Sequence, residues 1–267
     1  MPKTLEQADL DRREQILRAV TIEAGELALD WFNRRDTLQV ALKGPQDYAS
    51  EADAAVEQLL ARRLAEAVPE DQFLGEEGGG EVGERIWVVD PIDGTANFVR
   101  GMSRFCVSVA FVAGGEIQLG AIFSPVTDEL FLARRGHGAT LNGKPIRAAR
   151  TDRLERASIE VGWSSRLPYA AYLEVVRRML EAGVDFRRFG SGALGLANVA
   201  DGRADAYFEQ HINSWDCLAG ILLVEEAGGR VNDFLAGDGL RRGNPVLAVA
   251  PGVADKIAAL AGVALLG

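Results

Sequence analysis

The N-terminal part of the chain shows the 3.6-residue period of an amphipathic helix. Between residues 10 and 32, charged residues such as Arg12 and Glu23 separate apolar residues that recur three or four positions apart, namely Ile16, Leu17, Val20, Ala24, Leu27, Ala28 and Trp31. This spacing places the apolar side chains on one side of a helix. The pattern therefore predicts a helix over residues 10–32 that packs on a core.

A second helix is predicted a short distance further on. Gly44 and Pro45 interrupt the first pattern, and Ser50 and Asp53 then have the spacing of a capping box. The apolar residues that follow at helical spacing are Val56, Leu59, Leu60 and Leu64. Pro69 predicts the end of this helix, because proline has no N–H to donate.

Short apolar runs after residue 72 predict strands. Residues 86–89 form a continuous apolar run typical of a buried strand, which we expect to end at Asp90 because Pro91 interrupts the ladder. Residues 106–112 and 116–123 flank the sequence Ala-Gly-Gly at 113–115 and predict a hairpin. A further strand is predicted over residues 130–133.

The pattern changes after about residue 150. Strand-like segments at 158–161, 186–189, 206–209 and 245–250 alternate with helical patterns near 169–182, 191–201, 216–227 and 253–261. This alternation is typical of an α/β unit. We expect an α+β half with an antiparallel sheet over residues 1–150 and an α/β half over residues 151–267, with an interface between them.

Carboxylates gather where the predicted strand 86–89 ends. Asp90 and Asp93 follow it, Gly94 permits a tight turn and Thr95 adds a hydroxyl. Hard oxygen ligands of this kind suit Mg²⁺, which keeps several waters and is often completed by a substrate phosphate. Taken alone, however, an Asp-x-x-Asp-Gly pattern favours an acidic surface turn.

Three more acidic positions each allow two interpretations. Glu76 follows a short apolar run and is either a ligand or part of a solvated acidic loop. Asp53 lies in the first turn of a predicted helix, where a carboxylate also compensates the helix dipole. Asp216 stands at another predicted helix start, as a cap or as a ligand. The residues alone leave these alternatives open.

Longer motifs give the chain a family resemblance. Gly-Glu-Glu at 75–77, WVVDPIDGTANFV at 87–99 and SWDCLAGILLVEEAGG at 214–229 resemble the signature motifs of the inositol monophosphatase family. The likeness includes K-x-x-x-D-x-x-S-x-x-D at 43–53, G-x-G-A-x-x-N-G at 136–143 and Gly-Ser-x-Ala at 190–193. It implies a layered αβαβα sandwich, a homodimer, and a Mg²⁺-dependent, lithium-sensitive phosphatase acting on a small phosphorylated metabolite.

The resemblance also implies the metal ligands. Glu76, Asp90 and the backbone carbonyl of Ile92 match the ligands of a first Mg²⁺, and Asp90, Asp93 and Asp216 match those of a second. Asp53 matches a carboxylate that approaches Thr95 and either activates water or holds a third Mg²⁺ through water. Glu76, Thr95 and Asp53 are thus the implied catalytic residues, with two or three Mg²⁺ ions.

Substrate contacts are implied in the same way. Gly94 and Thr95 match contacts to the phosphate, Asp216 faces the substrate from the metal site, and Glu209 matches a residue that contacts substrate hydroxyl groups. The loop beside the inositol ring is matched by Gly190, Ser191 and Gly192. Gly192 stands where some family members have alanine, so ring contacts at that position are less defined.

The composition and charge of the chain disfavour some classes of binding partner. The 29 basic and 39 acidic residues give a formal net charge of −10, which argues against binding nucleic acid by bulk attraction but leaves a local phosphate site open. Cys106 and Cys217 are too few for a disulfide framework and are expected to be buried fillers. Without an apolar leader or membrane-length apolar run, we expect no membrane contact and a reducing cytoplasm.

Other chemistries lack support in the residues. His137 and His211 are far apart and have no cysteine partner for zinc. There is no G-x-S-x-G for a serine nucleophile, and the glycine-rich segment 75–84 lacks a Walker lysine, so we expect it to be a mobile flap that carries Glu76. The arginine pairs at 177–178, 187–188 and 241–242 are expected to be solvated, although a pair near the pocket could steer an anion.

These features predict a Mg²⁺-dependent phosphatase for inositol 1-phosphate, acting through a metal-activated water. Histidinol phosphate, fructose 1,6-bisphosphate and a 3′-phosphoadenosine nucleotide are alternative substrates. A regulatory or scaffold protein that keeps the fold for partner binding is a competing interpretation, which the full set of six carboxylates from Asp53 to Asp216 argues against.

Overall fold

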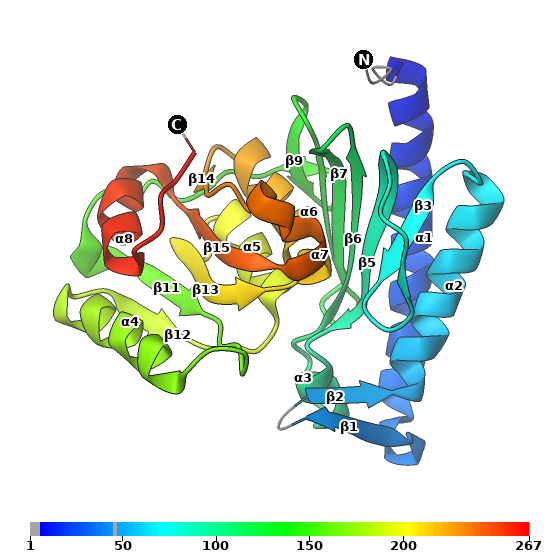
Figure 1. The fold of residues 1–267 in the computed structure, drawn as a ribbon, viewed down its shortest axis with the longest axis horizontal. Coiled ribbons are helices and arrows are strands. Elements are labelled where there is room, and N and C mark those ends of the chain that lie inside the picture. The colour runs from blue at the N-terminus through cyan, green and yellow to red at the C-terminus, as the bar shows by residue number, and fades with distance from the viewer. Residues whose placement is uncertain (1–5, 45–46, 267) are drawn as a thin grey trace.

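A computed structural model describes residues 6–44 and 47–266. The helices and sheets alternate in five layers (Figure 1). Helices α1 (Gln7–Asn33) and α2 (Glu51–Ala67) cover the outer face of an eight-stranded sheet. Helices α5 (Gly192–Ala200) and α6 (Ser214–Glu226) lie between that sheet and a five-stranded one, and α4 (Tyr169–Glu181) and α8 (Ala254–Ala261) cover the far side. The expected layered αβαβα sandwich is confirmed.

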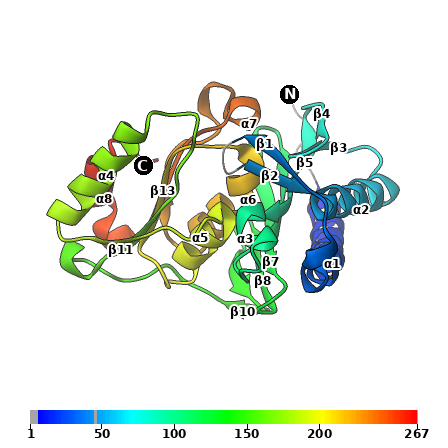
Figure 2. The same ribbon diagram turned by 90° about the horizontal axis from the view of Figure 1, so that it is seen from below.

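The two predicted N-terminal helices are confirmed. The apolar stripe of α1 buries Leu17, Val20, Ala24 and Ala28 against the sheet, and Ser50 and Asp53 form the predicted capping box of α2. Two strands that we did not predict, β1 (Val40–Gly44) and β2 (Asp47–Ser50), pair between the helices and lie beside α3 (Thr95–Val99) (Figure 2). The predicted break at Gly44 coincides with the end of β1, while Pro45 lies outside the described residues.

The eight-stranded sheet is antiparallel except at one pair. Its order is β10 (Lys144–Pro145), β9 (Gly138–Leu141), β8 (Glu129–Arg134), β7 (Glu116–Ser124), β6 (Cys106–Ala113), β5 (Arg85–Asp93), β3 (Gln72–Gly75) and β4 (Gly79–Gly80). The predicted hairpin is β6 and β7, and β8 confirms the strand at 130–133. Only β3 and β5 run parallel, which brings their C-terminal ends to the same edge.

One strand boundary was predicted wrongly. We expected the ladder to stop at Pro91, but β5 continues to Asp93, which pairs with Cys106 after a register shift between Asp90 and Asp93. A bulge lets a strand pass a residue that cannot donate. The extra residues place both aspartates on the strand instead of on a loop.

The second half follows the predicted alternation. The five-stranded sheet has the order β12 (Asp185–Arg187), β11 (Ser158–Val161), β13 (Ala206–Ile212), β15 (Asn244–Val249) and β14 (Arg230–Val231). Helix α7 (Gly239–Arg242) precedes β15. The division near residue 150 stays a prediction, and one apolar cluster crosses it, from Val88 and Ile122 through Leu196 and Leu218 to Val246.

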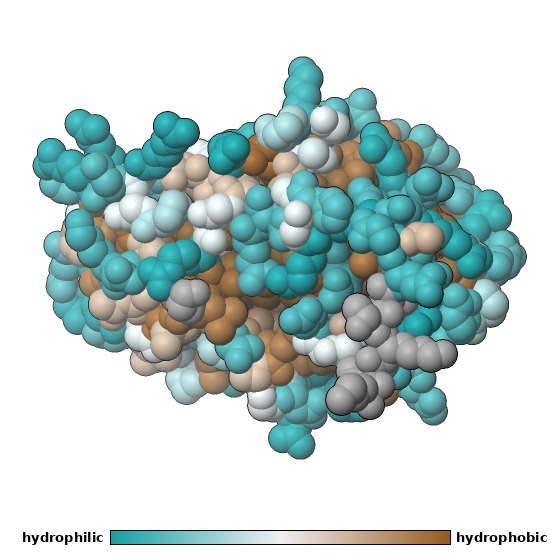
Figure 3. Space-filling model, turned by 90° about the horizontal axis from the view of Figure 1, so that it is seen from above, coloured by the Kyte–Doolittle hydropathy of each residue, from teal (hydrophilic) through white to brown (hydrophobic). Residues whose placement is uncertain are grey.

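The surface is mostly hydrophilic on the face shown in Figure 3. Hydrophilic side chains cover much of the face in Figure 3, and hydrophobic ones gather between them. Within the described ranges, no helix combines the length and apolar character needed to cross a bilayer.

Candidate metal and phosphate site

The parallel pairing of β3 with β5 positions two of the predicted ligands. Gly75 pairs with Val89, and the backbone N–H of Glu76 donates to the Val89 carbonyl at 3.2 Å. Glu76 therefore lies next to Asp90, which is 1% exposed. Burial, followed by the charge of Glu76, raises the pKa of Asp90 well above its ordinary value.

The bulge at the end of β5 shapes the turn that carries Asp93. The backbone N–H of Ile92 donates to Asp90 Oδ1 at 3.0 Å and holds that carboxylate against its own turn. Gly94 has a φ of +94°, and an added Cβ would lie 2.9 Å from the Arg104 carbonyl oxygen. Both the left-handed backbone and the close approach require glycine, as the sequence predicted.

Asp53 and Thr95 meet as the family resemblance implied. Asp53 is fully buried, and its Oδ2 accepts from the Ser50 N–H at 2.8 Å and from the Ser50 hydroxyl at 2.6 Å. Its Oδ1 lies 3.1 Å from Thr95 Oγ1, which is also 3.0 Å from the Ile92 carbonyl oxygen. The capping box and the approach to Thr95 are thus both present, because each uses a different carboxylate oxygen.

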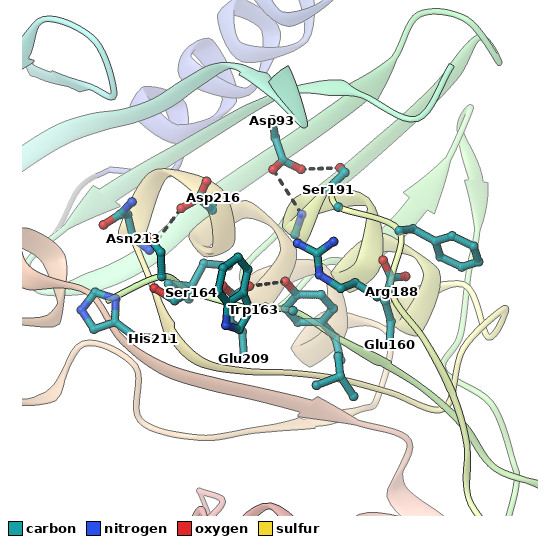
Figure 4. A pocket seen from close by; sticks show the side chains of 18 of the residues that line it. Asp93, Glu160, Trp163, Ser164, Arg188, Ser191, Glu209, His211, Asn213 and Asp216 are labelled. Carbon is teal, nitrogen blue, oxygen red and sulfur yellow. Dashed lines mark hydrogen bonds between the residues drawn. The ribbon is translucent and has the colours of Figure 1, made fainter. Parts of the chain in front are cut away.

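Asp93 joins the two halves of the molecule. Its carboxylate accepts from the Ser191 hydroxyl, from the Ala193 N–H at 2.8 Å and from the Gly192 N–H at 3.2 Å, at the N-terminus of α5 (Figure 4). These donors lower the pKa of Asp93, but burial outweighs them and the pKa is raised. The predicted Gly190–Gly192 loop is therefore in place beside the predicted ligand.

Asp216 enters from α6. It is the third residue of that helix, and its Oδ2 accepts from the Asn213 N–H at 3.1 Å. Burial and the charge of Asp93 raise the pKa of Asp216 to about 7. The predicted helix start near Asp216 is confirmed, and the helix directs its positive end toward the acidic cluster.

The three aspartates form a group that fits a hard cation. One carboxylate oxygen from each of Asp90, Asp93 and Asp216 lies within 4.8 Å of the others. Buried carboxylates this close repel one another and raise each other's pKa, so a divalent cation would stabilise all three in their ionised form. Glu76 lies outside this group, lines the same pocket and faces Asp90.

A hydrophilic pocket of about 480 Å³ opens beside the cluster (Figure 4). The predicted residues that line it are Glu76, Asp93, Gly190, Ser191, Gly192, Glu209 and Asp216. Asp90, Ile92, Gly94, Thr95 and Asp53 lie behind Asp93 in the hydrogen-bonded turn described above. The structure thus brings every predicted site residue to one region.

Sequence reasoning missed part of the pocket wall. Glu160, Trp163 and Arg166 line it, and Tyr207 donates to Glu209 Oε2 at 2.7 Å. Tyr207 and Glu209 are two residues apart on a strand, so their shared face was a usable signal. An acidic residue inside the apolar segment 158–161 was a second signal, since buried acids need a reason.

The acidic glycine-rich segment after β3 is anchored. Residues 77–78 form a tight turn between β3 and β4, and Glu57 Oε2 and Oε1 accept from the N–H groups of Glu77 at 2.9 Å and Gly78 at 2.6 Å. Glu57, on α2, is 7% exposed. The expectation of a mobile flap that carries Glu76 stays a prediction, and it did not include the hydrogen bonds to this helix carboxylate.

The structure also places the two cysteines, two of the arginine pairs and His211. Cys106 and Cys217 are free and buried, and Cys106 Sγ lies 3.7 Å from Asp93 Oδ2. Arg177 pairs with Glu174 and Glu181 on the surface. Arg188 and His211 line the pocket, so the 187–188 pair is the one placed to meet an anion.

Comparison with known proteins agrees with this geometry. A family model described as the inositol monophosphatase family matches residues 9–262. The chain is 46% identical to the Nus factor SuhB of Xylella fastidiosa over 221 residues, covering 82% of this chain and 80% of that protein. It is 41% identical to the inositol-1-monophosphatase of Rhizobium meliloti over 227 residues, covering 83% and 85%.

A solved structure has the same architecture. The extragenic suppressor protein suhB of Bartonella henselae superposes with a TM-score of 0.87 at 36% identity, covering 92% of this chain and 97% of that one. With the family model spanning nearly the whole chain, the protein belongs to the inositol monophosphatase family, a family of phosphomonoester hydrolases that act on small phosphorylated substrates.

Proposed function

We propose that the protein is a Mg²⁺-dependent phosphatase that hydrolyses myo-inositol 1-phosphate to inositol and phosphate. The observation that carries this proposal is the group of three buried aspartates at the base of a hydrophilic pocket. A relative named inositol-1-monophosphatase, 41% identical over 83% of the chain, supports the substrate.

Two or three Mg²⁺ ions would be held by this chain's own oxygen atoms. The proposed ligands are Glu76, Asp90, the Ile92 carbonyl, Asp93 and Asp216. When bound, the ions supply a water of lowered pKa and neutralise charge on the phosphate and the leaving oxygen. The pKa values of Asp90 and Asp216 are raised, and a bound cation would stabilise the ionised form of both carboxylates.

The protein's remaining work is positioning and proton transfer. Thr95 Oγ1 lies between Asp53 and the Ile92 carbonyl, so its position is fixed on two sides. Glu76 and Thr95, with Asp53 behind, would hold the attacking water and accept its proton. Gly94 and Thr95 would contact the phosphate.

The far side of the pocket would bind the inositol ring. Gly190, Ser191 and Gly192 form a loop at one wall, and Glu209 faces the cavity from β13. The Ser191 hydroxyl already donates to Asp93, so this loop both holds a ligand residue and borders the ring site. We also propose that the protein is a homodimer, as the family resemblance implies. Light scattering tests this by measuring the mass of the particle in solution.

A panel of phosphomonoesters with and without Mg²⁺ tests the function. It contains myo-inositol 1-phosphate, histidinol phosphate, fructose 1,6-bisphosphate and a 3′-phosphoadenosine nucleotide. We expect the highest kcat/KM on the inositol ester, complete loss with EDTA and inhibition by Li⁺. A higher kcat/KM on another ester would replace the proposed substrate.

A regulatory role is the second candidate. The observation that favours it is that several relatives, including the 46% identical one, are named Nus factors. A protein with this role would act without hydrolysing a substrate. No hydrolysis of any ester in the panel with Mg²⁺ would favour this role over the phosphatase.

A further inference from the structure

Tyr207 and Glu209 form a hydrogen-bonded pair on one face of β13. Residues two apart on a strand point the same way, and the Tyr207 hydroxyl donates to Glu209 Oε2 at 2.7 Å. Tyr207 is 2% exposed and Glu209 is partly exposed, and both residues line the pocket. In Figure 4 Glu209 lies across the pocket from Asp93.

Three glycines from two other elements make room for this pair. A Cβ added at Gly162, after β11, would lie 2.0 Å from Glu209 Oε2 and 2.6 Å from the Tyr207 hydroxyl oxygen. One added at Gly195 on α5 would lie 2.4 Å from Tyr207 Cδ2, inside the aromatic ring's contact distance. One added at Gly192 would lie 3.0 Å from the hydroxyl oxygen.

Local structure does not explain Gly162 and Gly195. Gly195 lies inside α5, where glycine is less favourable than alanine. Neither Gly162 nor Gly195 has a positive φ, so backbone conformation does not explain them. Space for Tyr207 and Glu209 does.

The hydrogen bond leaves one carboxylate oxygen for the pocket. Oε2 of Glu209 is occupied by the Tyr207 hydroxyl, while burial and nearby acids raise the pKa of that phenol well above its ordinary value and keep it a donor. Oε1 then has a fixed direction. An acceptor of fixed direction recognises hydroxyl groups at a defined place and gives nothing to a substrate without them.

We propose that Tyr207 is a positioning residue that aims Glu209 at the hydroxyl groups of a polyol phosphate, in a space set by Gly162, Gly192 and Gly195. This inference rests on the proposed function, and it adds the device that selects phosphate esters of polyols over esters without hydroxyl groups. Tyr207 acts through Glu209, because its hydroxyl group donates to Glu209 Oε2.

The test compares two substrates in Tyr207→Phe and in wild type. Myo-inositol 1-phosphate carries the hydroxyl groups, and phenyl phosphate carries none. Phenylalanine keeps the ring packed against Gly195, so the variant should fold with an unchanged melting temperature. We expect the ratio of kcat/KM for the inositol ester over phenyl phosphate to fall about tenfold, mostly through KM, since the hydrogen bond that fixes Glu209 is lost.

Two further variants sharpen the test. Gly162→Ala should lower the same ratio, because its methyl group would displace Glu209 Oε2. Tyr169→Phe is the matched control, since Tyr169 is 71% exposed on α4, and its ratio should equal that of wild type. An unchanged ratio in Tyr207→Phe, or an equal loss on both substrates, would overturn the inference.

Binding without turnover separates this inference from the proposed function. Calorimetry with myo-inositol 1-phosphate and Ca²⁺ in place of Mg²⁺ should show about tenfold weaker binding to Tyr207→Phe. If wild type hydrolyses no ester yet binds the inositol ester in a Tyr207-dependent way, the phosphatase proposal fails and the positioning role stands. Equal binding by both proteins would remove the positioning role whatever the turnover.

Discussion

Asp71 and Asp90 have two buried carboxylates, one just before β3 and one on its parallel neighbour β5, and their surroundings are opposite. Asp71 precedes β3, and its side chain is 0% exposed between Arg13, which donates to both oxygens at 2.8 Å, and the Trp87 indole at 3.1 Å. Asp90, at the other end of β5, is 1% exposed and faces Glu76, Asp93 and Asp216.

These surroundings indicate different roles for the two carboxylates. Where the chain supplies its own cation, as Arg13 does for Asp71, the buried charge is satisfied and holds α1 to the sheet. Where the chain gathers several carboxylates around a buried one, the ionised state requires a cation from outside. The two ends of one strand pair therefore differ as a structural ion pair differs from the proposed ligand shell.

The largest effect should come from replacing a carboxylate of the second kind. Asp90→Asn and Asp216→Asn are expected to abolish Mg²⁺-dependent hydrolysis, a loss beyond the about 10–100-fold that outer-shell partners of metal ligands are worth. Both variants should fold, because amides remove repulsion from the cluster. Initial rates at saturating Mg²⁺ and circular dichroism measure the two effects, and wild-type turnover by either variant would exclude its ligand role.

Replacing the carboxylate of the first kind should act on stability instead. Asp71→Asn leaves Arg13 buried without its main partner, which is expected to cost about 3–5 kcal/mol of unfolding free energy. Urea unfolding measures it. Glu70 also pairs with Arg13 but is 46% exposed. The control variant Glu70→Gln should therefore lose under about 1 kcal/mol of unfolding free energy. Equal losses in both variants would contradict the comparison.

The sequence predicted the elements whose signals are local. The helices α1, α2 and α6 and the hairpin of β6 and β7 each follow from periodicity, a capping pattern or a turn within one segment. The ligand set followed from motifs whose resemblance to a family carries spatial information that no local pattern holds. Asp53 illustrates this, because a capping pattern alone could not indicate that its second oxygen faces Thr95.

Features that depend on distant partners were not predictable. The path of β5 beyond Pro91 is set by pairing with Cys106 on the next strand, and the ion pair of Arg13 with Asp71 joins residues 58 positions apart. Likewise, Tyr207 gains its position from Gly162 and Gly195, which lie on other elements. In each case the physical cause is tertiary packing, which periodicity does not contain.

Thr95→Ala should have a smaller effect than loss of a ligand. Its hydroxyl sits between Asp53 and the Ile92 carbonyl, so removing it takes away a group that would position water and leaves the carboxylates in place. We expect kcat to fall about 100-fold, the lower end for positioned proton transfer. Mg²⁺ affinity, measured by calorimetry, should change less than threefold, and an unchanged kcat would exclude the positioning role.

The smallest effect concerns the stability of the metal-free protein at different pH values. The pKa is raised to about 7 for Asp216 and to about 8 for Glu209, in both cases first by burial. In the unfolded chain these groups titrate near pH 4. Between the unfolded pKa near 4 and the folded pKa of about 8, the folded state holds more protons than the unfolded state. The stability of the folded state therefore falls as the pH rises.

We therefore expect metal-free protein to lose unfolding free energy as the pH rises from about 5 to about 8. Mg²⁺ should restore most of this loss at the upper pH and little at the lower one, since the cation binds the ionised carboxylates. Urea unfolding with EDTA or Mg²⁺ at both pH values measures the four free energies. Asp216→Asn should reduce the dependence, because an amide has no proton to lose and only the contribution of Glu209 remains, whereas Glu70→Gln should leave it as in wild type. A metal-free protein equally stable at both pH values would show that the aspartate group is balanced from within the chain, as Asp71 is.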